Sequence, residues 1–127
     1  MTRIFIVEDS APVRERIDRK LRAARGLLIV GVAATLEEAE RLLPVARADV
    51  ILLDLRLPDG IGIDLIKTVR KRKWPAAVVV LTNHCSESYE RASLQAGADA
   101  FLSKQHDFEN LIAEIERIAE RSRNPEP

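Results

Sequence analysis

The segment Val50-Ile51-Leu52-Leu53-Asp54 combines the two features that decide the fold of this chain. Its four apolar residues form a run that is too short for a helix and typical of a strand covered on both faces. A carboxylate follows directly, at the position where such a strand would end. The segment therefore predicts a buried strand that brings Asp54 to the edge of a sheet.

Four more apolar runs resemble this segment, and longer amphipathic segments separate them. Short buried strands that alternate with helical segments are typical of βαβ units around a parallel sheet. We therefore expect an α/β fold with one parallel sheet, in which every strand is short and buried. The predicted strands are 4–7, 28–33, 50–53, 77–81 and 100–102.

Capping residues mark the helices that connect these strands. A hydroxyl or carboxylate side chain at a helix start accepts a backbone hydrogen bond, and glycine readily ends a helix. Two glycines, Gly60 and Gly62, loosen the loop after Asp54. Five helices are predicted: from Ser10 and Pro12 to Gly26, from a capping box of Thr35 and Glu38 to about Val45, over 63–70, from Ser86 or Ser88 to Gly97, and one that Asp107 caps, with its apolar stripe over 111–119.

Composition limits the class of protein. The 127 residues suffice for one domain, which we place at 1–121, with 122–127 as a frayed tail or the start of a linker. Lysine plus arginine equals aspartate plus glutamate at 20 each, so no net charge favours direct nucleic-acid binding. A single cysteine cannot form an internal disulfide, and no signal peptide or membrane-spanning stretch is visible. We therefore expect a cytoplasmic protein without membrane association.

Charged side chains gather where the predicted strands end. Glu8 and Asp9 follow the first strand, Asp54 the third, and Lys104 the last, while Thr82 ends the fourth. Ligand sites of open α/β sheets lie beyond the carboxyl ends of the strands, so these residues should converge. Three carboxylates in one pocket repel one another unless a cation neutralises them. Oxygen ligands of this kind suit Mg²⁺.

The same residues suggest phosphoryl chemistry. With Mg²⁺ bound, Asp54 is the candidate nucleophile toward a phosphoryl group, because the metal and the Lys104 ammonium neutralise charge on opposite sides. Thr82 adds a hydroxyl donor. Zinc is a poorer candidate, since the adjacent His84 and Cys85 have no further partners for a tetrahedral site.

Motifs along the whole chain then resemble the receiver domain of bacterial two-component response regulators. The resemblance rests on Ile6-Val7-Glu8-Asp9-Ser10, on Leu52-Leu53-Asp54-Leu55-Arg56-Leu57-Pro58-Asp59-Gly60, on Val80-Leu81-Thr82 and on Gly97-Ala98-Asp99-Ala100-Phe101-Leu102-Ser103-Lys104. It implies a flavodoxin-like, doubly wound parallel sheet of five strands in the order 2-1-3-4-5 with five helices.

The resemblance also implies roles for the site residues. Asp54 would accept a phosphoryl group from a sensor histidine kinase or a phosphotransfer protein. Asp9, Asp54 and the Arg56 carbonyl would hold Mg²⁺, and Glu8 would act through a coordinated water. Thr82 and Lys104 would hold phosphoryl oxygens, and Thr82 with Phe101 would form the switch. The protein would catalyse only its own phosphorylation and dephosphorylation and would not be an enzyme in the wider sense.

Some positions depart from the family pattern. Asn83 stands where receivers usually carry a small residue. Gln105 replaces the usual proline after Lys104, so we expect a trans peptide bond between Lys104 and Gln105. Arg56, Asn83 and His84 would line the site entrance, where they could tune donor access and phosphoryl lifetime.

Several readings of the whole protein remain open. The chain could be a stand-alone receiver that docks onto a downstream protein, a regulatory fragment of a longer transcription factor or enzyme, or a phosphorylation-independent binding module. A small-molecule phosphohydrolase and a flavin carrier are weaker alternatives, because a second acidic motif and a phosphate-cradling loop are both missing. A phosphorylation-dependent homodimer is also open, and the candidate docking surface combines Tyr89, Arg91, Phe101 and the last helix.

Overall fold

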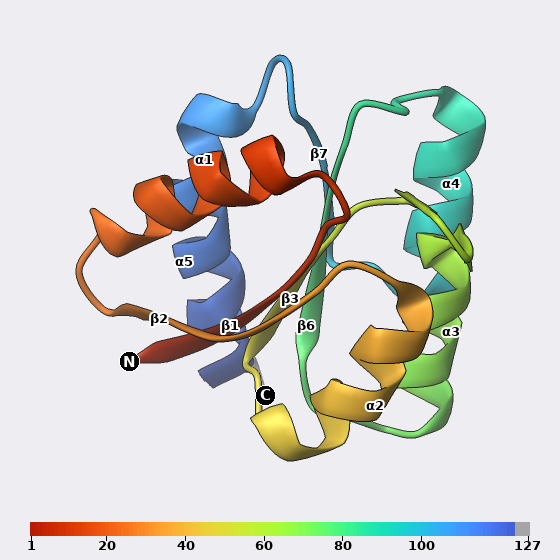
Figure 1. Ribbon diagram of the computed structural model, residues 1–127, viewed down its shortest axis with the longest axis horizontal. Helices are drawn as coiled ribbons and strands as arrows, with labels where there is room; N and C mark the ends of the chain where they lie inside the picture. Colours follow the sequence, from red (N-terminus) through yellow and green to blue (C-terminus); the bar gives the residue numbers. More distant parts are fainter. Residues whose placement is uncertain (124–127) are drawn as a thin grey trace.

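The computed structural model describes residues 1–123 and arranges them around one sheet of five parallel strands in the order β2-β1-β3-β6-β7 (Figure 1). Counting only these strands, the order is 2-1-3-4-5, which confirms the flavodoxin-like, doubly wound fold. Each lies within two residues of its predicted bounds. The strands are β1 (Thr2–Val7), β2 (Leu27–Ala33), β3 (Val50–Leu53), β6 (Ala77–Thr82) and β7 (Ala100–Ser103).

Helices cover both faces of this sheet, as Figure 1 shows. The first and last helices share one apolar core cluster with one face, and the other three pack on the opposite face. The predicted tail over 124–127 lies outside the described residues, whereas Ser122 still belongs to the last helix. The helices are α1 (Ala11–Arg22), α2 (Leu36–Ala46), α3 (Gly62–Lys71), α4 (Glu87–Ala96) and α5 (Leu111–Arg123).

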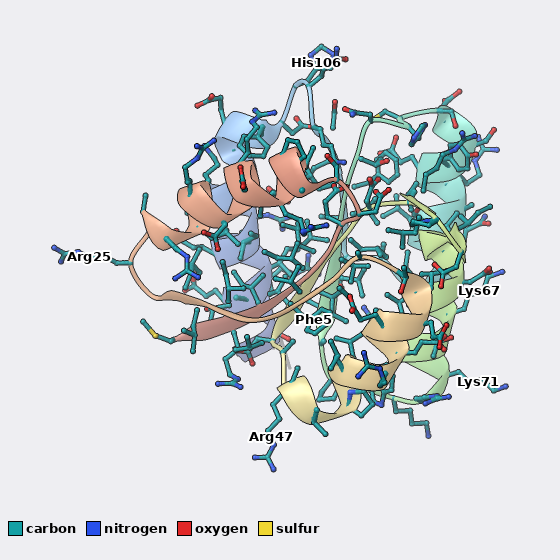
Figure 2. All side chains as sticks on the ribbon, in the orientation of Figure 1. Phe5, Arg25, Arg47, Lys67, Lys71 and His106 are labelled. Atoms are coloured by element: carbon teal, nitrogen blue, oxygen red, sulfur yellow. The ribbon has the colours of Figure 1, made fainter. Side chains whose placement is uncertain are left out.

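Strand β1 shows how the sequence builds two cores at once. Successive side chains of a strand point to opposite faces of the sheet. Ile4 and Ile6 therefore join the core under α1 and α5, while Phe5 and Val7 join the core under α2, α3 and α4. Figure 2 shows Phe5 in the interior, with Arg25, Arg47, Lys67, Lys71 and His106 projecting from the outside.

The expectation that every strand is buried is wrong for β2. This strand lies at the edge of the sheet, and Leu28 and Val32 are each 41% exposed. A continuous apolar run predicts a strand but does not show whether it lies in the middle or at the edge.

The loop after Asp54 contains a small antiparallel hairpin that the sequence did not predict. Strands β4 (Arg56–Leu57) and β5 (Gly60–Ile61) pair across a turn at Pro58 and Asp59. Two-residue strands are too short to show any periodicity. Gly62 follows directly, and a Cβ at this position would lie 2.5 Å from the Asp54 carbonyl oxygen. Gly62 thus allows α3 to begin against the end of β3 rather than merely loosening the loop.

Most predicted helix ends are confirmed, but α1 ends at Arg22 and not at the predicted Gly26, which lies in the turn that follows. The Ser10 and Thr35 hydroxyls accept hydrogen bonds from the backbone N–H groups of Val13 and Glu38, at 3.4 and 3.1 Å. The Glu38 carboxylate completes the capping box on the backbone N–H of Ala34. Ser86, rather than Ser88, caps α4, which Gly97 ends with a left-handed φ of 118°.

The predicted role of Asp107 as a helix cap is wrong. Its carboxylate accepts a hydrogen bond from the backbone N–H of Ser103 at 2.7 Å. A 3₁₀ turn over Phe108–Asn110 then leads into α5. Aspartate stabilises local turns as well as helix starts, and its sequence position does not distinguish the two.

Two further features concern the peptide bonds and the helices of the described residues. Residues 1–123 contain no cis peptide bond, which includes the link between Lys104 and Gln105. None of the helices in this range combines the length and the apolar character that a membrane crossing requires.

Candidate functional site

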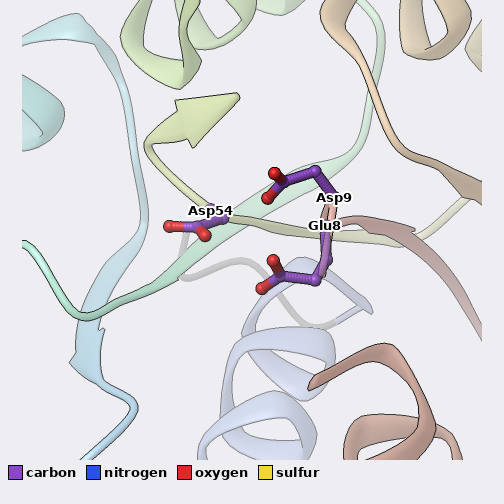
Figure 3. Close-up of side chains that lie close together, drawn as sticks. All are labelled: Glu8, Asp9 and Asp54. Carbon is purple, nitrogen blue, oxygen red and sulfur yellow. The ribbon is translucent and has the colours of Figure 1, made fainter. Parts of the chain in front are cut away.

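Three carboxylates meet beyond the carboxyl ends of the two central strands (Figure 3). Val7 of β1 pairs with Leu53 of β3, so the residues that follow leave neighbouring strands at the same level. One carboxylate oxygen from each of Glu8, Asp9 and Asp54 lies within 4.8 Å of the others. The convergence predicted from the sequence is therefore present.

Glu8 is buried, although a glutamate after a strand is commonly exposed to solvent or caps the following helix. Its side chain is held from two sides: the Lys104 ammonium lies 2.5 Å from Oε1, and the Ser10 backbone N–H donates to Oε2 at 3.1 Å. Burial raises the pKa of the Glu8 carboxyl above its usual value, and the hydrogen bond from Lys104 opposes that rise.

Lys104 links the two buried carboxylates. Its Nζ also donates to Asp54 Oδ2 at 2.9 Å, and its backbone N–H donates to the Thr82 carbonyl. Burial on its own would lower the pKa of the Lys104 ammonium, but hydrogen bonds to Glu8 and Asp54 outweigh burial and raise it. The side chain is therefore a firmly charged cation inside the site.

Asp54 and Asp9 occupy different environments. Asp54 is only 7% exposed, and its second oxygen accepts a hydrogen bond from the backbone N–H of Leu55 at 2.7 Å. Asp9 is exposed. Three carboxylates and one ammonium carry a formal excess of two negative charges. The exposed Asp9 places part of this charge at the surface.

The remaining predicted residues surround the charged cluster. Thr82 is fully buried, and its Oγ1 accepts a hydrogen bond from the backbone N–H of His84 at 3.1 Å. Asn83 is exposed and His84 half-buried. Arg56 begins β4 with an exposed side chain, two residues beyond Asp54. Phe101 is half-buried on β7 and packs against the core under α2, α3 and α4.

Two residues with a clear local role escaped the sequence analysis. Arg14 of α1 donates from Nη1 to the backbone carbonyls of both Glu8 and Asp9. Asp59, in the hairpin turn, accepts hydrogen bonds from the backbone N–H groups of Leu36 and Glu37 and so caps α2 from a distant segment. The only signal for Arg14 was a positive charge close to a helix start, where such a charge is unfavourable.

A separate cavity lies away from these residues. It measures about 690 Å³ and is lined by residues that precede the strands, including Met1, Asp49 and Ala76, together with the half-buried Trp74. It lies at the opposite end of the sheet from Asp54. We assign the chemistry to the carboxylate cluster, because that is where charged groups converge and where the pKa values of Glu8 and Lys104 are shifted.

Several known proteins with similar sequences are transcriptional regulators. The family model described as "Response regulator receiver domain" matches residues 4–116. The chain is 38% identical over 122 residues to the KDP operon transcriptional regulatory protein KdpE of Escherichia coli (strain K12). This alignment covers 95% of this chain and 52% of that protein. It is 36% identical over 104 residues to the DNA-binding transcriptional activator DevR/DosR of Mycobacterium tuberculosis. This alignment covers 82% of this chain and 48% of that protein. The chain thus spans about half the length of these relatives.

Solved structures give the same result. A two-component response regulator of the LuxR family from Aurantimonas sp. SI85-9A1 superposes with a TM-score of 0.88 at 31% identity, over 94% of this chain and 86% of that chain. A CheY-like receiver domain protein from Methanospirillum hungatei JF-1 superposes with a TM-score of 0.89 over 99% of both chains; at 24% identity this likeness shows the shared fold. The strand order, the sequence match and the relatives together show that the chain belongs to the response regulator receiver domain family of two-component signal transduction.

Proposed function

We propose that Asp54 accepts a phosphoryl group from a phosphohistidine on a sensor histidine kinase or a phosphotransfer protein. The observation that carries this proposal is that Asp54 contacts the Lys104 ammonium and lies within a cluster with two further carboxylates. A nucleophilic carboxylate needs positioning and charge neutralisation for phosphoryl transfer, and this arrangement supplies the protein's part of both.

The residues present fit a Mg²⁺ ion. The cluster offers only carboxylate oxygens, which a hard divalent cation prefers, and it has two negative charges in excess. Asp9 is exposed and leaves room for water ligands, whereas Glu8 is already bonded to Lys104 and Ser10. This difference supports direct ligation by Asp9, with Glu8 acting through water. Asp54 and the Arg56 carbonyl are proposed as the other ligands from the membership of the receiver family. When bound, Mg²⁺ would neutralise the carboxylates and the charge on the phosphoryl oxygens.

The transfer step is a simple displacement. A carboxylate oxygen of Asp54 bonds to phosphorus while the P–N bond to the donor histidine breaks, and the imidazole leaves with the electron pair and takes up a proton. The product is an acyl phosphate on Asp54. Lys104 already contacts Asp54 Oδ2, so its ammonium is placed to pair with a phosphoryl oxygen after transfer.

We further propose that Thr82 and Phe101 transmit the change. The Thr82 hydroxyl accepts a hydrogen bond from the His84 backbone N–H and can still donate its own O–H, so a phosphoryl oxygen would accept from it and draw the side chain toward Asp54. Phe101 is half-buried on β7, which pairs with the strand that ends at Thr82, and its ring would turn inward behind Thr82. Such a shift would alter the surface that contains the half-buried Tyr89 and the exposed Arg91, where a downstream protein would dock.

The test is the intact mass of the protein after incubation with Mg²⁺ and a small acyl phosphate donor. The wild type should gain one phosphoryl group only when Mg²⁺ is present, and Asp54→Asn should gain none. Asp59→Asn is the matched control, since it changes an exposed carboxylate in the same loop and should be modified like the wild type. A folded wild type that stays unmodified, with a small donor and with kinases, would instead support a phosphorylation-independent binding module.

A second candidate concerns the whole protein. Because the chain spans about half the length of its curated relatives, a regulatory receiver within a longer transcription factor or enzyme is also supported. One relative, 33% identical over 116 residues, is a protein-glutamate methylesterase/protein-glutamine glutaminase of Carboxydothermus hydrogenoformans. The reading frame downstream of Pro127 tests this candidate: an in-frame output domain supports it, and a stop codon contradicts it.

A further inference from the structure

Arg14 holds the backbone of the acidic pair through a single nitrogen. Its Nη1 donates to the Glu8 carbonyl at 2.9 Å and to the Asp9 carbonyl at 3.0 Å. Other basic residues of α1 have different partners: Arg16 lies over the ring of Phe108, and Arg22 pairs with Asp18. Arg14 thus links α1 directly to the two residues that open the site.

The position of Arg14 in the helix makes this contact informative. It lies one turn from the start of α1, and its backbone N–H bonds to the Ser10 carbonyl. The first turn of α1 contains no acidic residue. A positive charge near a helix start opposes the helix dipole, so helix stability does not account for arginine at this position.

Arg14 also completes a closed set of hydrogen bonds around the acidic pair. The Glu8 backbone N–H is anchored to the Ala33 carbonyl at 2.9 Å, and the Ser10 N–H returns to the Glu8 carboxylate. With the two carbonyls fixed by Arg14, each residue of the pair has a defined backbone direction. Glu8 then points inward to Lys104, and Asp9 remains exposed at the mouth.

We propose that Arg14 is a positioning residue that orients Glu8 and Asp9 for divalent cation binding, an inference that rests on the proposed function. A role through charge and a role through positioning predict opposite changes in cation affinity when Arg14 is removed. As a mere positive charge, Arg14 would repel a cation, and its removal would strengthen cation binding. As a positioning residue it organises the ligands, and its removal would weaken binding.

The experiment measures Mg²⁺ binding calorimetrically, without a phosphodonor, in wild type, Arg14→Gln, Arg14→Lys and Arg19→Gln. We expect Arg14→Gln to raise the Kd for Mg²⁺ by about tenfold, as the loss of an outer-shell partner commonly does. Arg14→Lys keeps the charge and a single nitrogen that can donate to both carbonyls, so it should recover much of the wild-type affinity. Arg19→Gln removes the same charge from an exposed position of α1 and should keep the wild-type Kd. Circular dichroism confirms that each variant is folded.

Phosphorylation kinetics provide a second measurement. If Arg14 acts only by orienting cation ligands, Arg14→Gln should need more Mg²⁺ for half-maximal rate but reach nearly the wild-type rate at saturation. Unchanged or tighter Mg²⁺ binding by Arg14→Gln would overturn the inference, as would equally weakened binding by Arg14→Gln and Arg19→Gln. A wild type that neither binds Mg²⁺ nor becomes phosphorylated would overturn the proposed function as well, which separates the two failures.

Discussion

The Lys104 ammonium contacts two buried carboxylates, and its replacement tests how much that contact stabilises the fold. In Lys104→Met, Glu8 and Asp54 would face each other without a neutralising partner. Removing one partner of a buried ion pair commonly costs about 3 kcal/mol. We expect a loss of that order in the free energy of unfolding measured by urea denaturation without Mg²⁺. A Lys67→Met control at an exposed position should change it little, and equal stability of Lys104→Met and wild type would refute the prediction.

Residues at strand ends could be identified from the sequence because a local pattern placed each of them. Glu8, Asp9, Asp54 and Lys104 each follow an apolar run, and parallel strands end on the same edge of the sheet. Arg14 could not be found in this way. Its role depends on a long side chain that reaches backbone carbonyls, and no pattern of residue types records such a contact.

The start of α2 offers a test of pH dependence at the scale of one helix. Hydrogen bonds from the backbone N–H groups of Leu36 and Glu37 lower the pKa of the Asp59 carboxyl below its usual value of 3.8. A depressed pKa in the folded state stabilises the protein above the unfolded pKa, and this contribution is lost as the pH falls through the folded pKa. Asp59→Asn removes the titrating group.

Urea denaturation from pH 7 down to pH 3 measures this effect. The difference in free energy of unfolding between wild type and Asp59→Asn should be largest near neutral pH and should shrink as the pH falls below about 4. Glu37→Gln alters a carboxylate in the same first turn, which controls for a general loss of negative charge at the helix start. A difference that stays constant over this range would show that Asp59 does not act through its ionised cap.

Elements were predictable to the extent that they are long and periodic. All five helices and the five sheet strands carry apolar runs or stripes, whereas the β4–β5 hairpin has two residues in each strand. The edge position of β2 depends on which strand lies beside it, a fact about the sheet that β2 itself does not contain. Asp107 precedes a helical segment as a cap would, yet its carboxylate bonds backward to Ser103.

At the scale of the whole molecule, the order of the strands was the part that periodicity could not supply. Alternating strands and helices predict a parallel sheet, but the same alternation is compatible with several strand orders. The order 2-1-3-4-5 followed from the resemblance to receiver domains, and the structure confirms it. This order puts β1 beside β3, which is what brings the acidic pair next to Asp54.

That arrangement predicts a global dependence of stability on Mg²⁺. The two excess negative charges repel one another in the folded state, and they separate when the chain unfolds. A cation that binds only the folded chain stabilises it by about 2.7 kcal/mol at a concentration of 100 times its Kd. We therefore expect the unfolding midpoint of the wild type to rise with Mg²⁺ concentration, as measured by thermal denaturation at constant ionic strength.

The Asp9→Asn variant shows whether this stabilisation arises at the carboxylate cluster. Without Mg²⁺, the variant should be at least as stable as the wild type, because one of three like charges is gone and Asp9 is exposed. With Mg²⁺, its stabilisation should be small, since a ligand has been lost. The substitution should thus keep or raise the stability without Mg²⁺ and lower the stabilisation that Mg²⁺ provides. If Mg²⁺ stabilises Asp9→Asn and wild type equally, the cation binds outside the cluster and the proposed site is wrong.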